Sequence, residues 1–139
     1  MTLPTRIVVT TALVLALGGL VALLPLLAES VEPRTVVVVA RQMSFYVGED
    51  KASNPTISAA PGESIRIIFV NEDSGFDHDF SVTAWAVRTP VVHGKGRTSI
   101  ELQVPPKPGK VAYLCSIHAS MMMGTIEVVA PGSLATSER

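Results

Sequence analysis

The stretch "KVAYLCSIHASMMMGTIEVV", residues 110–129, decides the fold that we predict for this chain. Its two ends, 110–114 and 124–129, are rich in apolar and β-branched residues and predict two short strands. The loop between them holds the chain's single cysteine, one of its three histidines and three of its five methionines. A loop between neighbouring strands holds its side chains with little freedom, which is the preorganisation that a metal site needs.

The chain before this stretch also predicts strands separated by turns. Apolar or alternating runs predict strands at 35–39 and on toward 45, 56–59, 64–71, 78–85 and 100–104. Proline- and glycine-rich turns, such as "PGE" at 61–63, separate them. Helical periodicity is not evident after residue 34. About seven to eight short strands predict an all-β fold, an antiparallel sandwich or barrel.

Residues 7–28, "IVVTTALVLALGGLVALLPLLA", are apolar and uncharged, with Arg6 just before them. A helix over this range would be about 33 Å long, enough for a hydrocarbon core of about 30 Å. A cleaved signal peptide is the alternative, although the segment is long for one and the small-residue cleavage pattern is poor. We expect an N-terminal apolar helix that anchors the chain in a membrane if it is uncleaved. The positively charged flank of the segment stays on the cytoplasmic side, so we expect residues 35–139 to face the cell surface or the periplasm. If the segment is cleaved, we expect the domain to be secreted.

We therefore expect three parts in the chain: a signal peptide or membrane anchor plus a short linker at 1–34, one domain at 35–130 and a flexible tail at 131–139. Lysine and arginine number 11 against 12 acidic residues, so no basic surface for nucleic acid is expected. We expect the domain to be monomeric. A lone cysteine in an exported domain is an intermolecular bridge, a reactive thiol or a metal ligand.

The ligand types in the loop indicate which metal ion it could bind. Structural zinc takes four nitrogen or sulfur ligands, and a thioether is not one of them. A thiolate and two imidazoles in a plane, with a long axial thioether, form the blue-copper arrangement. Cys115, His118 and a methionine supply three of these groups. From the residues alone the second histidine is either His78, which opens a predicted strand, or His93, in a glycine-rich loop.

Two stretches, "PTISAAPGESIRIIFVNEDSGFDHDF" at 55–80 and "PKPGKVAYLCSIHASMMMGTIEVV" at 106–129, resemble the cupredoxin (type 1 copper) family. The resemblance covers most of the predicted domain. It implies a Greek-key β-sandwich or barrel that binds one copper ion through His78, Cys115, His118 and a methionine.

The resemblance also bears on which methionine is the axial ligand. In the family a Met-x-Gly pattern precedes the closing strand, and counting back from Gly124 gives Met122. Met121 is the runner-up, because its spacing from His118 also fits the family. Met123 is expected to point away from Met122 by the alternation of a strand.

A contact beside the ligands follows from the same resemblance. In several family members an asparagine after the first histidine bonds to the residue after the cysteine, and here these positions are Asp79 and Ser116. The carboxylate departs from the family pattern. Asp79 can accept from the Ser116 hydroxyl or from a backbone N–H, but a carboxylate cannot donate.

Other polar and aromatic residues are expected to be structural. We expect a surface role for His93 and a core position for Trp85. The acidic group is expected to form a solvated loop, with contact to a basic partner as the alternative; it comprises Glu72, Asp73, Asp77 and Asp79.

The predicted function is one-electron transfer at a mononuclear copper, between redox proteins such as a cytochrome or an oxidase complex. The resemblance implies that the electron leaves through the exposed edge of His118, amid apolar residues such as Ala119 and Met121. The alternative is a copper carrier or storage module that binds Cu(I) through cysteine, histidine and methionine. An enzyme is not expected, because copper enzymes of this kind hold further copper ions through additional histidines. The chain has three histidines, and two of them are used as ligands, so only one remains.

Overall fold

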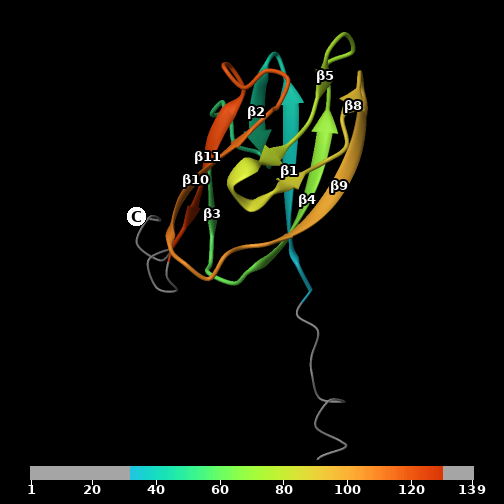
Figure 1. The fold of residues 1–139 in the computed structure, drawn as a ribbon. Coiled ribbons are helices and arrows are strands. Elements are labelled where there is room, and N and C mark those ends of the chain that lie inside the picture. The colour runs from blue at the N-terminus through green and yellow to red at the C-terminus, as the bar shows by residue number, and fades with distance from the viewer. Residues whose placement is uncertain (1–31, 130–139) are drawn as a thin grey trace, which may run out of the picture. The chain divides into compact units, whose positions relative to one another are not determined.

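The computed structural model describes residues 32–129, which form two β-sheets packed face to face (Figure 1). The predictions for the apolar segment 7–28 and the tail 131–139 lie outside the described residues. Within 32–129, no helix has the length and apolar character needed to cross a membrane. The all-β sandwich is confirmed for this part of the chain.

The first sheet has four strands in the order β2-β1-β4-β9. Their bounds are β1 Arg34–Arg41, β2 Ser44–Val47, β4 Ser64–Asn71 and β9 Gly96–Gln103. In β4 every second residue is buried, which is the period of a strand with one face on the core.

The second sheet has five strands in the order β3-β11-β10-β6-β7. Their bounds are β3 Thr56–Ala59, β11 Met123–Val128, β10 Gly109–Leu114, β6 Ser81–Val82 and β7 Val87–Arg88. A separate pair joins β5, Asp77–His78, to β8, Val92–His93. A short 3₁₀ helix, η2, spans Thr83–Trp85.

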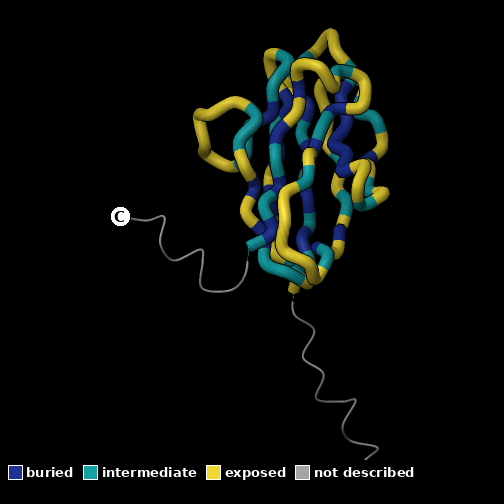
Figure 2. Tube along the Cα trace, turned by 60° about the vertical axis from the view of Figure 1, so that its left-hand side comes forward, coloured by how far each residue is buried: buried dark blue, intermediate teal, exposed yellow. Residues whose placement is uncertain are grey.

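Aromatic side chains fill the space between the two sheets. Phe45, Phe80 and Tyr113 are fully buried and in mutual ring contact, with centroids 5.3–6.2 Å apart. Figure 2 shows the buried positions running along the strands, with the exposed positions mostly in the loops. The interdigitated rings fix the spacing of the sheets, and so the positions of the loops at their ends.

The sheets are not purely antiparallel, so that part of the prediction is wrong. β1 pairs in parallel with β4, and β3 in parallel with β11. Between β2 and β4 the chain crosses to the other sheet to form β3, and β4 therefore returns beside β1 in the same direction.

The strand count is also higher than predicted, with eleven strands among residues 32–129. Four of these, β5 to β8, have only two residues each. The predicted strand at 78–85 is divided because His78 pairs with β8, whereas Ser81 pairs with β10 and β7. The glycine-rich loop predicted around His93 is shorter than expected, because all of β4 pairs with β9 and brings Gly96–Ser99 into the sheet.

Glu63 ties the start of β1 to the turn before β4. Arg34 donates two hydrogen bonds to its carboxylate, and the backbone N–H of Ala60 donates a third at 2.8 Å. The hydrogen bonds from Arg34 and Ala60 hold the pKa of Glu63 below its ordinary value of 4.5, although partial burial raises it. The ionised form therefore stabilises the fold.

Because the folded-state pKa of Glu63 is depressed, its stabilising contribution is present above the unfolded value and is lost as the pH falls through the folded one. We expect Glu63→Gln to lower the free energy of unfolding at pH 7 and to flatten its decline between about pH 5 and 3. Urea denaturation at a series of pH values measures this. Glu49→Gln, at an exposed loop position, controls for the loss of one charge; equal pH profiles for the two variants would contradict the assignment.

Candidate metal centre

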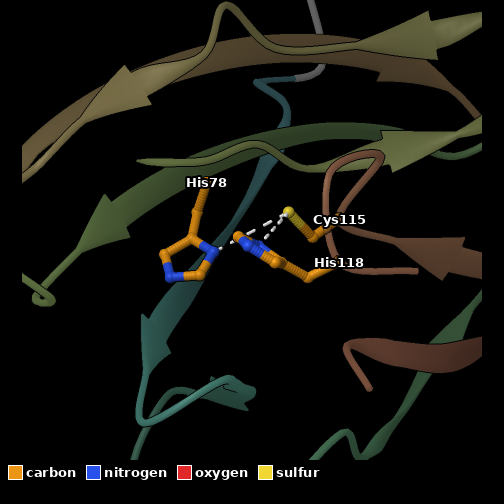
Figure 3. Close-up of side chains that lie close together, drawn as sticks. All are labelled: His78, Cys115 and His118. Carbon is orange, nitrogen blue, oxygen red and sulfur yellow. Dashed lines mark hydrogen bonds between the residues drawn. The ribbon is translucent and has the colours of Figure 1, made fainter. Parts of the chain in front are cut away.

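Three predicted ligands come together at one end of the sandwich (Figure 3). His78 ends β5, Cys115 directly follows β10, and His118 lies on the loop between β10 and β11. The Cys115 Sγ atom lies 3.7 Å from Nδ1 of His78 and 3.7 Å from Nδ1 of His118. The ligand atoms of all three residues lie within 4.8 Å of one another.

These separations fit one small metal ion. With metal–nitrogen bonds of about 2.0 Å and a metal–thiolate bond of about 2.3 Å, a trigonal arrangement puts sulfur and nitrogen about 3.7 Å apart. A thiolate and two imidazoles in this arrangement, with room for a weak thioether, is the donor set of type 1 copper. The residues present therefore fit a copper ion, which would lie between the three side chains.

Backbone hydrogen bonds shape the loop that carries these ligands. The N–H of Cys115 donates to the carbonyl of Met122 at 3.0 Å, which closes the base of the loop. The carbonyl of Cys115 accepts from the N–H of His118 at 3.2 Å, and the carbonyl of His118 accepts from Met121 and Met122. This succession of tight turns brings His118 back toward the thiol and fixes both side chains.

The structure separates the three adjacent methionines. Met122 is fully buried, whereas Met121 and Met123 are each 54% exposed. Met123 begins β11 and faces outward, as the alternation of the strand predicts. Of the three thioethers, only that of Met122 lies inside the protein.

Asp79 and Ser116 are in contact, as predicted. The Asp79 carboxylate accepts from the backbone N–H and from the hydroxyl of Ser116, both at 2.6 Å. Sequence reasoning missed a second partner, Arg88, whose Nε donates a third hydrogen bond to Oδ2 at 2.6 Å. Burial raises the pKa of Asp79, but the hydrogen bonds from Ser116 and Arg88 outweigh it and hold the pKa below its ordinary value. The carboxylate thus joins the two loops that carry His78 and Cys115.

The prediction that the acidic group forms a solvated loop is wrong for two of its members. Asp79 is fully buried, and Asp73 Oδ2 lies 3.1 Å from Nε2 of His78. Burial raises the pKa of Asp73, but hydrogen bonds from the Gln42 backbone and from His78 outweigh it and lower the pKa. Asp73 therefore belongs to the surroundings of the metal centre, which the sequence did not indicate.

His93 does not join the cluster. Its side chain is 78% exposed, and its Nδ1 lies 2.7 Å from Oδ2 of Asp77, its partner in the β5–β8 pair. This is the predicted surface position. Trp85 is only partly buried, at the edge of the core instead of within it.

Apolar side chains are exposed close to His118. Phe76 is 51% exposed and its ring centroid lies 6.3 Å from that of His118, edge to face. Ile117 and Met121, next to His118 along the loop, are about half exposed. The sequence analysis had indicated Met121 but not Phe76 or Ile117. It had also indicated Ala119, which is exposed. We call Phe76, Ile117 and Met121 the apolar rim.

Known proteins were compared with the chain by sequence and by structure. No protein-family model matches. Rusticyanin from Acidithiobacillus ferrooxidans is 32% identical in an alignment 94 positions long, which covers 58% of this chain and 46% of the relative. The chain thus spans about half the length of the curated relatives it matches.

The structural comparison finds similar copper proteins. A crystal structure of a rusticyanin variant is 28% identical, with a TM-score of 0.51 over 73% of this chain and 80% of that one. Auracyanin A, a "blue" copper protein from Chloroflexus aurantiacus, has a TM-score of 0.55 at 15% identity over 70% of this chain and all of that one. Because of its low identity, the second likeness bears on the fold alone.

The sandwich, together with a thiolate and two imidazoles at its end, defines a type 1 copper protein. The predicted resemblance to the cupredoxin family is confirmed: rusticyanin is similar to the chain in sequence and structure, and auracyanin is similar in fold. The predicted cofactor, one copper ion, is confirmed. The prediction that the chain is not an enzyme agrees with these relatives, which are copper proteins.

Proposed function

We propose that the chain is a one-electron carrier that passes electrons between redox partners on the outer face of a membrane. The observation that carries this proposal is the cluster of His78, Cys115 and His118, buried except at the edge of His118. When bound, copper supplies the Cu(II)/Cu(I) couple. The side chains hold the donor atoms, exclude water and offer one route to the surface.

A carrier benefits when its donor atoms move little as the charge changes. Cys115 and His118 are fixed by the backbone bonds of their loop, and His78 by its strand pairing and by Asp73. Since each ligand is held by contacts that do not involve the metal, the protein imposes the same donor positions on both oxidation states. This supports electron transfer over a function that requires the site to open.

Met122 is proposed as the axial ligand, because it is the buried member of the three methionines. We expect Met122→Ala to shift the visible band of the Cu(II)-loaded protein and to change its reduction potential, since the axial ligand tunes both. Met121→Ala, an equal truncation one residue away, is expected to leave the band and potential near those of the wild type. A larger shift for Met121→Ala would show that Met121 is the ligand.

The apolar rim is the proposed site of electron exit. His118 is the one ligand with partial exposure, and Phe76 and Ile117 flank it with apolar surface. A small apolar patch without charge suits brief contact with a partner, since it can be desolvated without breaking ion pairs. The partner class we propose is a redox protein such as a cytochrome or an oxidase complex.

A charge placed on the rim should slow electron transfer without altering the copper site. We expect Ile117→Lys to lower the rate of electron self-exchange, measured by NMR on mixtures of the two oxidation states, by about tenfold or more, because two like charges meet at the contact. The reduction potential should hardly change. Val37→Lys, a matched change at a partly exposed residue of β1, controls for added charge; equal rates in the two variants would exclude the rim as the contact.

The location of the carrier is also a proposal. The uncharged segment 7–28 preceded by Arg6 supports export, either with the segment retained as an anchor or with its removal as a signal peptide. An intact mass of the protein from the membrane fraction separates the two: retention predicts the full chain mass, and cleavage a product that lacks the segment.

A copper carrier that binds only Cu(I) is the second candidate. The observation in its favour is the pair of exposed thioethers, Met121 and Met123, since soft ligands suit Cu(I). The buried, preorganised cysteine and histidines favour the electron carrier. A stable coloured Cu(II) form excludes a carrier of Cu(I) alone.

A further inference from the structure

The two ring nitrogens of His78 face different partners. Nδ1 lies 3.7 Å from the Cys115 thiol, and Nε2 lies 3.1 Å from the Asp73 carboxylate. A carboxylate can only accept, so it fixes the proton on Nε2 and leaves the lone pair of Nδ1 directed toward the ligand cluster. Such a partner also makes a metal-binding imidazole more basic.

Asp73 is itself held in place by the fold. Its second oxygen, Oδ1, accepts from the backbone N–H of Gln42 at 3.0 Å, and its own N–H donates to the Asn71 side chain at 2.9 Å. The Asn71 amide in turn bonds to two backbone carbonyls at 2.8 and 3.1 Å. The carboxylate therefore has little freedom, and its side chain is only 17% exposed.

Asp73 connects His78 to a strained turn, because its other oxygen accepts from Gln42. Gln42 and Met43 connect β1 to β2 in two residues, and both have positive φ, 50° and 57°. Such a turn favours Asn-Gly, and other residues there cost free energy. Strain of this kind persists where the surrounding structure stabilises it, and the bond from Gln42 to Asp73 is one such contact.

The charge of Asp73 acts mainly on His78. The buried Asp79 has Arg88 as a cationic partner, whereas within residues 32–129 no lysine or arginine side chain forms an ion pair with Asp73, whose Oδ2 faces the His78 ring. His78 is fully buried, so solvent screens the interaction little. A negative charge at this place stabilises the more positive state of a metal held by the ring.

We propose that Asp73 is a positioning residue that acts through His78: it fixes the orientation of the ring, favours Cu(II) over Cu(I) and couples the β1–β2 turn to the copper site. The proposal rests on the proposed function, because it concerns the same copper couple. It gives Asp73 a role that the sequence pattern did not indicate.

The first test is Asp73→Asn in the full chain, which keeps the size and an acceptor oxygen but removes the charge. We expect the affinity for Cu(II) to fall by about 10–100-fold, the usual effect of losing such a partner, and the affinity for Cu(I) to fall less. Each tenfold fall in the affinity for Cu(II) relative to the affinity for Cu(I) raises the reduction potential by about 59 mV. Glu72→Gln, the neighbouring carboxylate with a half-exposed side chain, is the matched control and should leave the potential unchanged.

The second test needs no metal. Nitrogen-15 NMR of the histidine rings in the metal-free protein should show His78 as the Nε2–H tautomer, with a slowly exchanging proton that is lost or shifted in Asp73→Asn but not in Glu72→Gln. Asp73→Glu keeps the charge, and its potential should lie nearer the wild type. If Asp73→Asn is too unstable to load with copper, Asp73→Glu carries the test, since its longer side chain must shift the His78 ring signals.

The outcomes separate this inference from the proposed function. A blue wild type whose potential and His78 ring signals are unchanged in Asp73→Asn would overturn the role of Asp73. A wild type without a thiolate–copper band would overturn the proposed function. In that case the ring signals of the metal-free protein still show whether Asp73 fixes His78.

Discussion

Replacing Cys115 with serine is expected to abolish the intense visible absorption of the Cu(II)-loaded protein and to weaken Cu(II) binding by at least about 100-fold. Cys115 is the only cysteine in the chain, and its Sγ atom lies 3.7 Å from Nδ1 of both His78 and His118. The absorption arises from the bond between thiolate and Cu(II). A serine hydroxyl remains protonated and is a poor ligand for so soft a site.

The substitution should leave the fold intact, which makes the result interpretable. Serine is close to cysteine in size, and Cys115 is fully buried in a loop whose backbone bonds do not involve the side chain. Circular dichroism of the metal-free protein checks this. A Cys115→Ser protein that stays intensely coloured with Cu(II) would show that the thiol is not a ligand.

Substituting alanine for Gly124 is expected to destabilise the domain by about 3 kcal/mol, at the upper end for an overpacked core. A Cβ at this position would lie 2.3 Å from Cζ and Oη of Tyr113. The Tyr113 ring cannot easily move, because it stacks on Phe80 and its hydroxyl donates to the Pro55 carbonyl at 2.6 Å. Urea denaturation of the metal-free protein measures the loss.

Gly75→Ala is the matched control for Gly124→Ala, because a Cβ there would meet nothing within 4 Å. It should unfold close to the wild type. A double-mutant cycle with Tyr113→Leu should show that Gly124→Ala costs less when the ring is absent. If Gly124→Ala and Gly75→Ala are equally stable, the close approach of Tyr113 to the backbone is not important.

Several strands could be predicted because their signals are local. In β4 the alternation of apolar and polar residues marks the whole strand, and the bounds of β3 and β4 are those predicted. The parallel pairing of β1 with β4 could not be predicted in this way. It depends on where the chain crosses between the sheets, which no local pattern records.

Three of the four proposed ligands could be predicted for a different reason. Cys115, His118 and Met122 share one loop, so their spacing in the sequence carries their geometry. The contacts of Asp73 and Arg88 depend on how separate segments fold back on one another. A carboxylate in a polar loop is usually solvated, and no local pattern indicates that Asp73, and not its exposed neighbour Glu72, contacts a ligand.

The most direct test of the electron-carrier function is a redox titration of the copper-loaded full chain, followed in the visible spectrum. The predicted result is an intense thiolate–Cu(II) band near 600 nm, or its green variant, that disappears and returns with one electron per protein over repeated cycles. A protein that stays colourless with Cu(II), or that takes up only Cu(I), would contradict the account.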